Sequence, residues 1–324
     1  MHVGFIGAGK MASTLMKKVD DAEGATIAAV CDVEEDAARE AAEPRGADAY
    51  TDHRTFYDER PDIDAVFVAI PPFAYDDQVT LAAERGIDVF CEKPVALDPA
   101  RGRETLAAIE EAGIVTGAGY VFRYDEITEA AIDLLDGREI ALLDGRYWSG
   151  LLASAWGNEL ALSGGEIVTR ATHIYDTVRY LAGDVEHVAA AATDRIGTEE
   201  IDYPDATTAT LVHENGVVSS VSSAVTSPDW TAEVDVVGDG VSLTLDYTTQ
   251  ELTGSVDGEE IRREHPTDRY GREVEAFLQA SRANDPSTVR SDYADALRTL
   301  SLNWTVIDAA ESGERELVGT TPRS

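Results

Sequence analysis

The sequence predicts an α/β protein, with a doubly wound parallel sheet in the amino-terminal part followed by an α+β domain with a largely antiparallel open sheet. Through about residue 120, short apolar runs alternate with helical segments, which is typical of a parallel sheet covered on both faces. Beyond Tyr120, Asn-Gly and Asp-Gly pairs separate strand-like runs, as in antiparallel hairpins. The chain has 324 residues, and single cores usually stop growing at about 250 to 300. We therefore expect two domains, residues 1–120 and 121–324.

The strands of the first domain are expected where apolar, often β-branched residues run together between turn residues. These runs are 3–6, 26–31, 65–70, 87–91 and 114–118. Between the last two, Asp98 is a candidate N-cap and Pro99 a candidate first helical residue, which predicts a helix to about Ala112.

The second domain is predicted from its turns and its alternating residues. Three dipeptides favour the positive-φ turns of two-residue hairpins: Asn215-Gly216, Asp239-Gly240 and Asp257-Gly258. Apolar residues alternate with polar ones at Val241, Leu243, Leu245 and Tyr247, so one face of this sheet should be buried. Helices are expected near 126–136, 164–182, 270–282 and 290–311. The spare face of the sheet predicts self-association into a homo-oligomer.

The amino terminus carries a dinucleotide-binding pattern. An apolar run ends in Gly7-Ala8-Gly9-Lys10-Met11-Ala12, and Asp32 closes the next apolar run. Such glycines let the backbone approach a pyrophosphate, and the helix that follows directs its N–H groups at the phosphates. We therefore expect a Rossmann-type unit in which these glycines, Lys10, Met11 and Ala12 bind the cofactor and Asp32 binds the adenosine ribose. An ordinary strand-to-helix turn is the alternative for the glycines alone. Asp32 would repel a 2′-phosphate and Val33 offers no cation, so NAD is expected over NADP, with NADP remaining possible.

Composition excludes several classes of protein. Asp and Glu number 62 against 26 Lys and Arg, a formal charge of -36, which is typical of a protein from a high-salt cytoplasm. Nucleic-acid binding would need a basic surface. Because no apolar run is long enough to span a membrane and no charged-then-apolar leader precedes the first strand, we expect a cytoplasmic protein without a membrane partner. Cys31 and Cys91 both end buried strands, so neither a disulfide framework nor a metal site is expected.

Two further motifs carry residues suited to catalysis. Glu92-Lys93-Pro94 follows the strand 87–91, at the carboxyl edge where ligands bind in doubly wound sheets. Lys93 is one of only four lysines, and an exposed ion-pairing residue is the alternative. His173 lies on a polar helical stripe with Thr169, Asp176 and Tyr180. On position alone, the pattern favours an ordinary solvated or satisfied helix histidine over a functional one.

Taken in order, the motifs resemble those of the Gfo/Idh/MocA oxidoreductase family, and the resemblance covers essentially the whole chain. They are the Gly-x-Gly-x-x-Ala turn, Asp32, Ala69-Ile70-Pro71-Pro72, Glu92-Lys93-Pro94, Gly119-Tyr120-Val121-Phe122-Arg123-Tyr124, and Ser163-Gly164-Gly165 through His173-Ile174-Tyr175-Asp176. The resemblance implies an NAD(P)-dependent dehydrogenase that transfers a hydride between nicotinamide and a hydroxyl or carbonyl carbon of a sugar, polyol or similar small molecule.

The resemblance also implies roles for individual residues. Lys93 and His173 would be catalytic, with Lys93 holding the reacting oxygen and His173 exchanging the proton. Further cofactor contacts would come from Ile70, Pro71, Tyr75, Glu92 and Lys93. Substrate contacts would come from Tyr120, Arg123, Trp156, Thr169 and Asp176.

The sequence departs from the family pattern at three positions. Thr169 stands where an acid usually precedes the histidine, and Ile70 and Tyr75 replace the usual Thr and His. Asp176, one turn after His173, is a candidate substitute for the missing acid. Two alternatives therefore stay open: a glycosidase-type enzyme that oxidises, eliminates and re-reduces its substrate without net use of NAD, and a non-catalytic dinucleotide-sensing regulator.

Overall fold

The structure is a computed structural model that describes residues 1–319, and it divides into two compact units. Unit 1 comprises Met1–Gly119 and Asp268–Leu297, and unit 2 comprises Tyr120–Thr267 and the chain from Arg298 onward. The chain passes from unit 1 to unit 2 after Gly119, one residue before the predicted domain boundary. The segment 268–297, which was predicted to lie in the second domain, belongs instead to unit 1.

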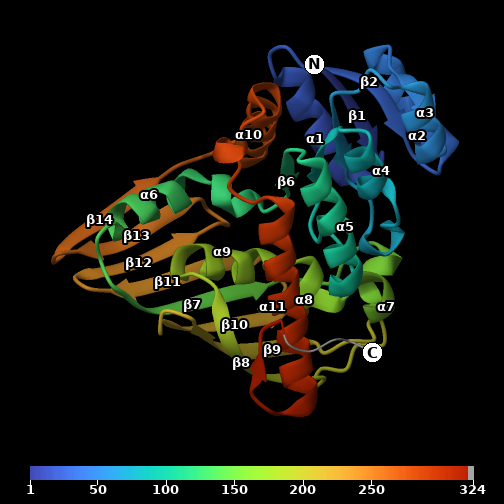
Figure 1. The fold of residues 1–324 in the computed structure, drawn as a ribbon. Helices are drawn as coiled ribbons and strands as arrows, with labels where there is room; N and C mark the ends of the chain where they lie inside the picture. The colour runs from blue at the N-terminus through green and yellow to red at the C-terminus, as the bar shows by residue number, and fades with distance from the viewer. Residues whose placement is uncertain (320–324) are drawn as a thin grey trace. The chain divides into compact units, whose positions relative to one another are not determined.

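Unit 1 is built on a parallel sheet that has six strands in the described part of the chain, in the order β3-β2-β1-β4-β5-β6. Figure 1 labels β1, β2 and β6 of this sheet. Every neighbouring pair is parallel, so the doubly wound sheet is confirmed. The strands are β1 (His2–Ile6), β2 (Thr26–Cys31), β3 (Asp48–Tyr50), β4 (Ala65–Val68), β5 (Asp88–Cys91) and β6 (Thr116–Ala118). The short strand β3 carries no apolar run and was not predicted.

The helices of unit 1 are α1 (Lys10–Asp21), α2 (Glu35–Ala42), α3 (His53–Glu59), α4 (Gln78–Glu84), α5 (Pro99–Ala112) and α10 (Arg269–Ala283), with short 3-10 helices at Glu43–Arg45, Pro72–Ala74 and Pro286–Thr288. Asp98 caps α5 by accepting from the N–H of Ala100, as predicted. α10 packs beside α1, and Phe277 contacts the rings of Phe67 and Phe90 edge-on at 5.3 and 5.6 Å. These aromatic contacts bind the returning segment to the sheet core.

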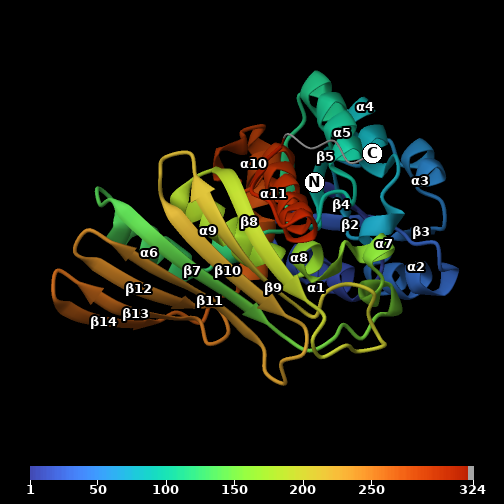
Figure 2. The same ribbon diagram turned by 90° about the horizontal axis from the view of Figure 1, so that it is seen from below.

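Unit 2 is built on a mixed sheet that has nine strands in the described residues, in the order β14-β13-β12-β11-β7-β10-β9-β8-β15. Figure 2 labels β7 to β14 of this sheet. Only the β7–β10 pair is parallel among these. The strands are β7 (Ile140–Trp148), β8 (Val185–Thr193), β9 (Ala206–His213), β10 (Val218–Ala224), β11 (Thr231–Gly238), β12 (Val241–Asp246), β13 (Glu251–Val256), β14 (Glu259–Glu264) and β15 (Glu316–Leu317). All three predicted dipeptides lie between antiparallel neighbours, and Val241, Leu243, Leu245 and Tyr247 are buried.

The helices of unit 2 are α6 (Glu126–Leu135), α7 (Leu160–Ser163), α8 (Gly165–Thr169) and α9 (Thr172–Ala182), with 3-10 helices at Val121–Tyr124 and Ala155–Asn158. α6 packs against β12 and β13, and α9 packs against β7, β10 and β11. α11 (Tyr293–Ser312) begins in unit 1 and continues into unit 2. The helix predicted over 164–182 is interrupted, because Arg170 leaves the helical conformation.

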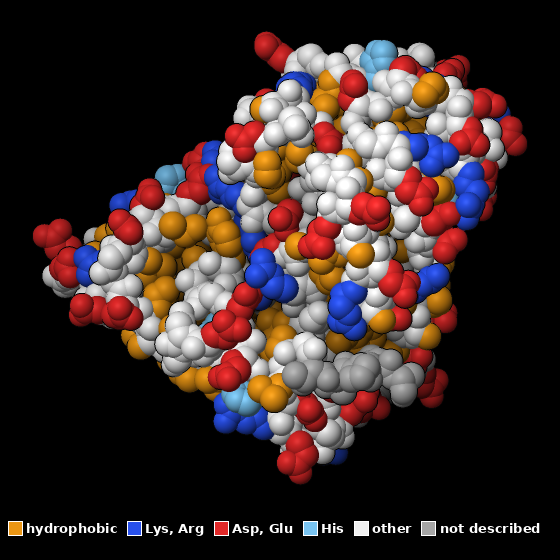
Figure 3. Space-filling view, in the orientation of Figure 1, with side chains coloured by type: hydrophobic (Ala, Val, Ile, Leu, Met, Phe, Trp, Pro, Cys, Tyr) orange, Lys and Arg blue, Asp and Glu red, His pale blue; other side chains and the backbone are white. Residues whose placement is uncertain are grey.

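The acidic composition is visible on the surface. Asp and Glu side chains are spread over the face of both units drawn in Figure 3, and Lys and Arg are fewer. Within residues 1–319, no helix is long and apolar enough to cross a membrane.

Candidate active site

The turn after β1 requires glycine at position 7. Gly7 has φ of +103°, and a Cβ there would lie 2.3 Å from the carbonyl oxygen of Ala69. Its N–H donates to the Cys31 carbonyl at 2.7 Å. The ends of β1, β2 and β4 are thereby held together, and the methyl of Ile70 lies against the same turn.

The amino-terminal end of α1 fits a bound phosphate. Its N-cap, Gly9, contributes no side-chain acceptor, and the first turn holds no acidic residue. A Cβ at Gly9 would meet nothing within 4 Å, so the space beside the turn is open. Lys10 is exposed in this first turn. Helical N–H groups without a side-chain cap are suited to a pyrophosphate.

Two of the predicted cofactor residues contribute by packing. Ala12 is fully buried in the core of unit 1, and Met11 packs against that core. A small side chain at position 12 lets α1 approach the sheet closely. The expected direct contact of the Ala12 side chain with the cofactor is therefore replaced by a supporting contact.

Asp32 is fixed at the end of β2 by two backbone groups. Its Oδ2 accepts from the N–H of Ala8 at 2.7 Å, and its Oδ1 accepts from the N–H of Glu34 at 3.0 Å. Each carboxylate oxygen can accept a second hydrogen bond. The arrangement therefore fits both hydroxyls of a ribose.

The loop after β4 is tied to the end of β5. The Tyr75 hydroxyl lies 2.9 Å from the carbonyl oxygen of Glu92 and 3.3 Å from that of Val68. The same loop carries Ile70 and the half-buried Pro71. Tyr75, which replaces the family's usual histidine, thus connects this loop to the Glu92-Lys93 segment.

Glu92 is a buried acid beside Lys93. Its side chain is 7% exposed, and its Oε2 accepts from the backbone N–H of Lys93 at 3.2 Å. A Cβ at Gly119 would lie only 2.9 Å from the same carboxylate, so that glycine provides the space for it. Burial raises the pKa of Glu92 to about 7, with the Lys93 charge opposing this increase. Lys93 is half-buried, and the peptide bond to Pro94 is cis.

In unit 2, His173 lies in the first turn of α9 against aromatic rings. Its ring is 5.0 Å from that of Phe122 and 6.1 Å from that of Tyr120. Phe122 in turn stacks on Tyr247 at 4.2 Å. Tyr247 was not predicted at this site, although it ends the alternating run that begins with β12 and lies one residue beyond that strand.

A hydroxyl cluster adjoins the histidine. The buried Tyr120 hydroxyl lies 3.0 Å from the Thr172 hydroxyl, which accepts from the amide of Asn303 at 2.6 Å. Thr172 and Asn303 were not predicted, because only the fold shows that α11 reaches α9. Trp156 lies in the 3-10 helix Ala155–Asn158 and is half-buried, and its predicted substrate contact stays a prediction.

Arg123 and Asp176 form a buried ion pair, which corrects the expectation that they contact substrate. Their side chains are 3% and 1% exposed, and the guanidinium donates to the carboxylate at 2.6 and 2.7 Å. Thr299 donates to the same carboxylate at 2.8 Å. Asp176 is thereby part of a buried ion pair, and its role as a substitute for the missing acid beside His173 stays a prediction.

Thr169 is also directed elsewhere. Its hydroxyl donates to the Gly165 carbonyl at 2.6 Å within α8. Helix α8 ends at Thr169, before α9 begins at Thr172. The substrate contact expected of this buried threonine is therefore not supported by its geometry.

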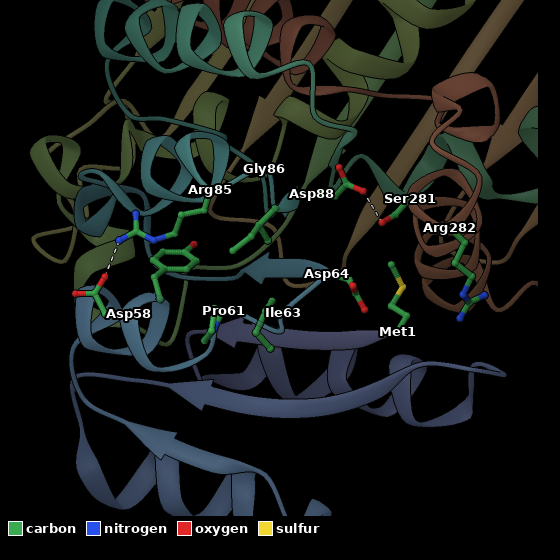
Figure 4. Close-up of a pocket in the computed structure, with 12 residues that line it drawn as sticks. Met1, Asp58, Pro61, Ile63, Asp64, Arg85, Gly86, Asp88, Ser281 and Arg282 are labelled. Carbon is green, nitrogen blue, oxygen red and sulfur yellow. Dashed lines mark hydrogen bonds and ion pairs between the residues drawn. The ribbon is translucent and has the colours of Figure 1, made fainter.

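A separate cavity of about 830 Å³ lies at the opposite edge of the parallel sheet, where β4 and β5 begin (Figure 4). Its charged groups already have partners: Arg85 donates to Asp58 at 2.7 Å, and Ser281 donates to Asp88 at 2.5 Å. We assign it no part in the chemistry. Across residues 1–319, no three His, Cys, Asp or Glu side chains are grouped to hold a metal ion.

The glycine turn, the uncapped helix and the acid at the end of β2 are the features of a dinucleotide-binding α/β unit. Residues 1–120 match the oxidoreductase family model described as an NAD-binding Rossmann fold, and residues 139–244 match the GFO/IDH/MocA C-terminal domain. The chain belongs to the Gfo/Idh/MocA family and is an NAD(P)-dependent oxidoreductase.

Individual relatives agree with this assignment. D-xylose 1-dehydrogenase (NADP(+)) 2 of Haloferax volcanii is 25% identical over 263 residues, covering 78% of this chain and 79% of that protein. D-apiose dehydrogenase of Paraburkholderia graminis is 30% identical over 261 residues, covering 75% and 67%. A solved levoglucosan dehydrogenase in complex with NADH shares the fold, with a TM-score of 0.87 and 20% identity over 99% of this chain and 100% of that one.

Proposed function

We propose that this protein oxidises a hydroxyl carbon of a sugar or polyol, or reduces the corresponding carbonyl, and that it prefers NAD to NADP. The observation that carries the proposal is the Glu92-Lys93 segment at the end of β5, which Tyr75 binds to the loop after β4 and for which Gly119 leaves space. The relatives named for xylose and apiose support the substrate class. The Asp32 carboxylate supports the cofactor preference.

Lys93 and His173 are the proposed catalytic pair. The bound nicotinamide supplies the hydride acceptor in oxidation and the donor in reduction. As the substrate C–H bond gives up its hydride, the hydroxyl proton passes to the His173 imidazole and the carbonyl forms. The Lys93 ammonium donates a hydrogen bond to the oxygen and stabilises its developing negative charge.

A sensor without turnover is the second candidate. One observation favours it: Thr169, which stands where an acid usually precedes the histidine, donates to the Gly165 carbonyl. Asp176, the candidate substitute, is bound to Arg123 and Thr299. A sensor would bind dinucleotide but show no reaction.

The family relationship is also consistent with a cytoplasmic protein that self-associates through the spare face of the unit 2 sheet.

A substrate panel separates these functions. Sugars, polyols and hydroxy acids are incubated with NAD at molar KCl, and both NADH absorbance and product formation are followed. Steady NADH production with an oxidised product supports the dehydrogenase. Product formation without net NADH identifies the redox-elimination alternative, and NADH binding without any product identifies the sensor.

A further inference from the structure

Asp32 is followed by three exposed acids at the corner between β2 and α2. These are Glu34, Glu35 and Asp36, here called the carboxylate run. Glu34 is the N-cap of α2, and Glu35 and Asp36 lie in its first turn. A helix N-terminus ordinarily favours an anion, but these carboxylates already occupy that favourable position.

The cations nearest in sequence to this corner are already paired. Within residues 32–45 they are Arg39 and Arg45. Arg39 donates to Asp36 at 2.6 Å, and Arg45 is bound to Asp20 at 2.6 Å. The residue between Asp32 and the carboxylate run is Val33, which is 84% exposed and uncharged.

A 2′-phosphate would add roughly 1.5 to 2 negative charges, at the ribose hydroxyl that Asp32 is placed to hold. Asp32 would repel this phosphate at contact distance. The carboxylate run would repel it through solvent. Repulsion through solvent depends on ionic strength, because the Debye length is about 10 Å at 0.1 M salt but about 3 Å at 1 M.

We propose that Glu34, Glu35 and Asp36 are specificity-determining residues that make cofactor choice depend on salt. They disfavour NADP at low ionic strength, and their contribution disappears at molar salt, where Asp32 alone discriminates. The inference deepens the proposed function and rests on it only in taking this corner as the adenosine-ribose site.

The test measures binding and needs no substrate. Dissociation constants for NADH and NADPH are determined by cofactor fluorescence, from the lowest KCl concentration at which circular dichroism shows the native fold up to 2 M, near the upper end of a practical range. The test variant is Glu34→Gln/Glu35→Gln, which leaves the Asp36–Arg39 pair intact. The matched control is Glu259→Gln/Glu260→Gln on exposed positions of β14, which changes the net charge equally.

For the native protein we expect the ratio of the NADPH to the NADH dissociation constant to fall by about fivefold as salt rises. In the test variant, most of that fall should already be present at low salt, and the change that remains with salt should be small because Asp36 is paired with Arg39. The control should follow the native protein. Asp36→Asn, which also releases Arg39, should lower the ratio further.

Two results overturn the inference: a test variant whose ratio equals the native one at every salt concentration, or a control that shifts as far as the test variant. Either leaves the proposed function standing if NADH still binds. Failure of the native protein to bind either cofactor refutes the proposed function itself, and the inference with it.

Discussion

Lys93 is the residue on which the proposed chemistry depends most. It follows β5 directly, and its backbone is held by Glu92. In Lys93→Ala, we expect turnover to fall by about 100-fold or more, since a donor aimed at a developing charge is worth that much. NADH affinity should change little. The measurement is kcat beside a fluorescence titration, with the exposed Lys17→Ala on α1 as the matched control.

Unchanged turnover in Lys93→Ala would remove the lysine from the mechanism. Loss of NADH binding together with turnover would instead assign it to the cofactor site.

Glu92 predicts a distinctive pH dependence of stability. Its folded pKa of about 7 exceeds the ordinary value of 4.5. As pH rises between these values, the unfolded chain releases its proton first, so the native protein loses stability, and above about 7 the loss is complete. Gln carries no charge and does not titrate. The free energy of unfolding of Glu92→Gln, relative to that of the native protein, should therefore rise by about 2–3 kcal/mol as the pH increases from 5 to 8.

The measurement is denaturant unfolding at constant KCl at both ends of that range, with the exposed Glu110→Gln on α5 as control. Parallel curves for native protein and Glu92→Gln across pH would show that the carboxyl does not titrate near neutrality.

At the scale of elements, the Arg123–Asp176 pair holds the Val121–Tyr124 turn against α9, and Thr299 connects α11 to the same carboxylate. Arg123→Ala leaves a carboxylate buried without its cation, which typically costs about 3–5 kcal/mol. Arg298→Ala is the matched control, because the Arg298 side chain, which pairs with Asp184, is 58% exposed. Such an exposed ion pair should contribute at most about 1 kcal/mol to the free energy of unfolding.

Unfolding free energies from denaturant titration decide between these expectations. Equal small losses in both arginine variants would show that the buried pair does not stabilise these elements.

Local sequence patterns predicted where helices and strands occur better than they predicted where a helix is broken. The Asn-Gly and Asp-Gly dipeptides placed three hairpins, because positive φ is a local requirement. The helix predicted over 164–182 instead breaks at Arg170, whose guanidinium binds Glu166 and the Gly150 carbonyl. Those partners lie partly outside the helix, so no helical periodicity could predict the break.

At the scale of the whole molecule, the first strand, the glycine turn and the helix that follows could be predicted because they lie in one continuous stretch of sequence. That residues 268–297 return to unit 1 could not be predicted from the sequence. An apolar stripe on α10 shows only that Phe277 is buried, whereas its partners Phe67 and Phe90 lie far away in sequence. The pairing of Arg123 with Asp176 was hidden for the same reason, since each alone is a plausible substrate ligand.

The net charge of -36 predicts that the fold depends on salt. Carboxylates spread over both units repel one another (Figure 3), and the repulsion is relieved when the chain expands. Raising KCl from dilute buffer to about 1 M shortens the Debye length to about 3 Å, so the melting temperature should rise by several degrees or more. Screening is nearly complete by then, so the rise should flatten beyond that concentration. Calorimetry across a KCl series measures the curve, and a melting temperature that stays constant from dilute to molar salt would contradict the role of charge repulsion.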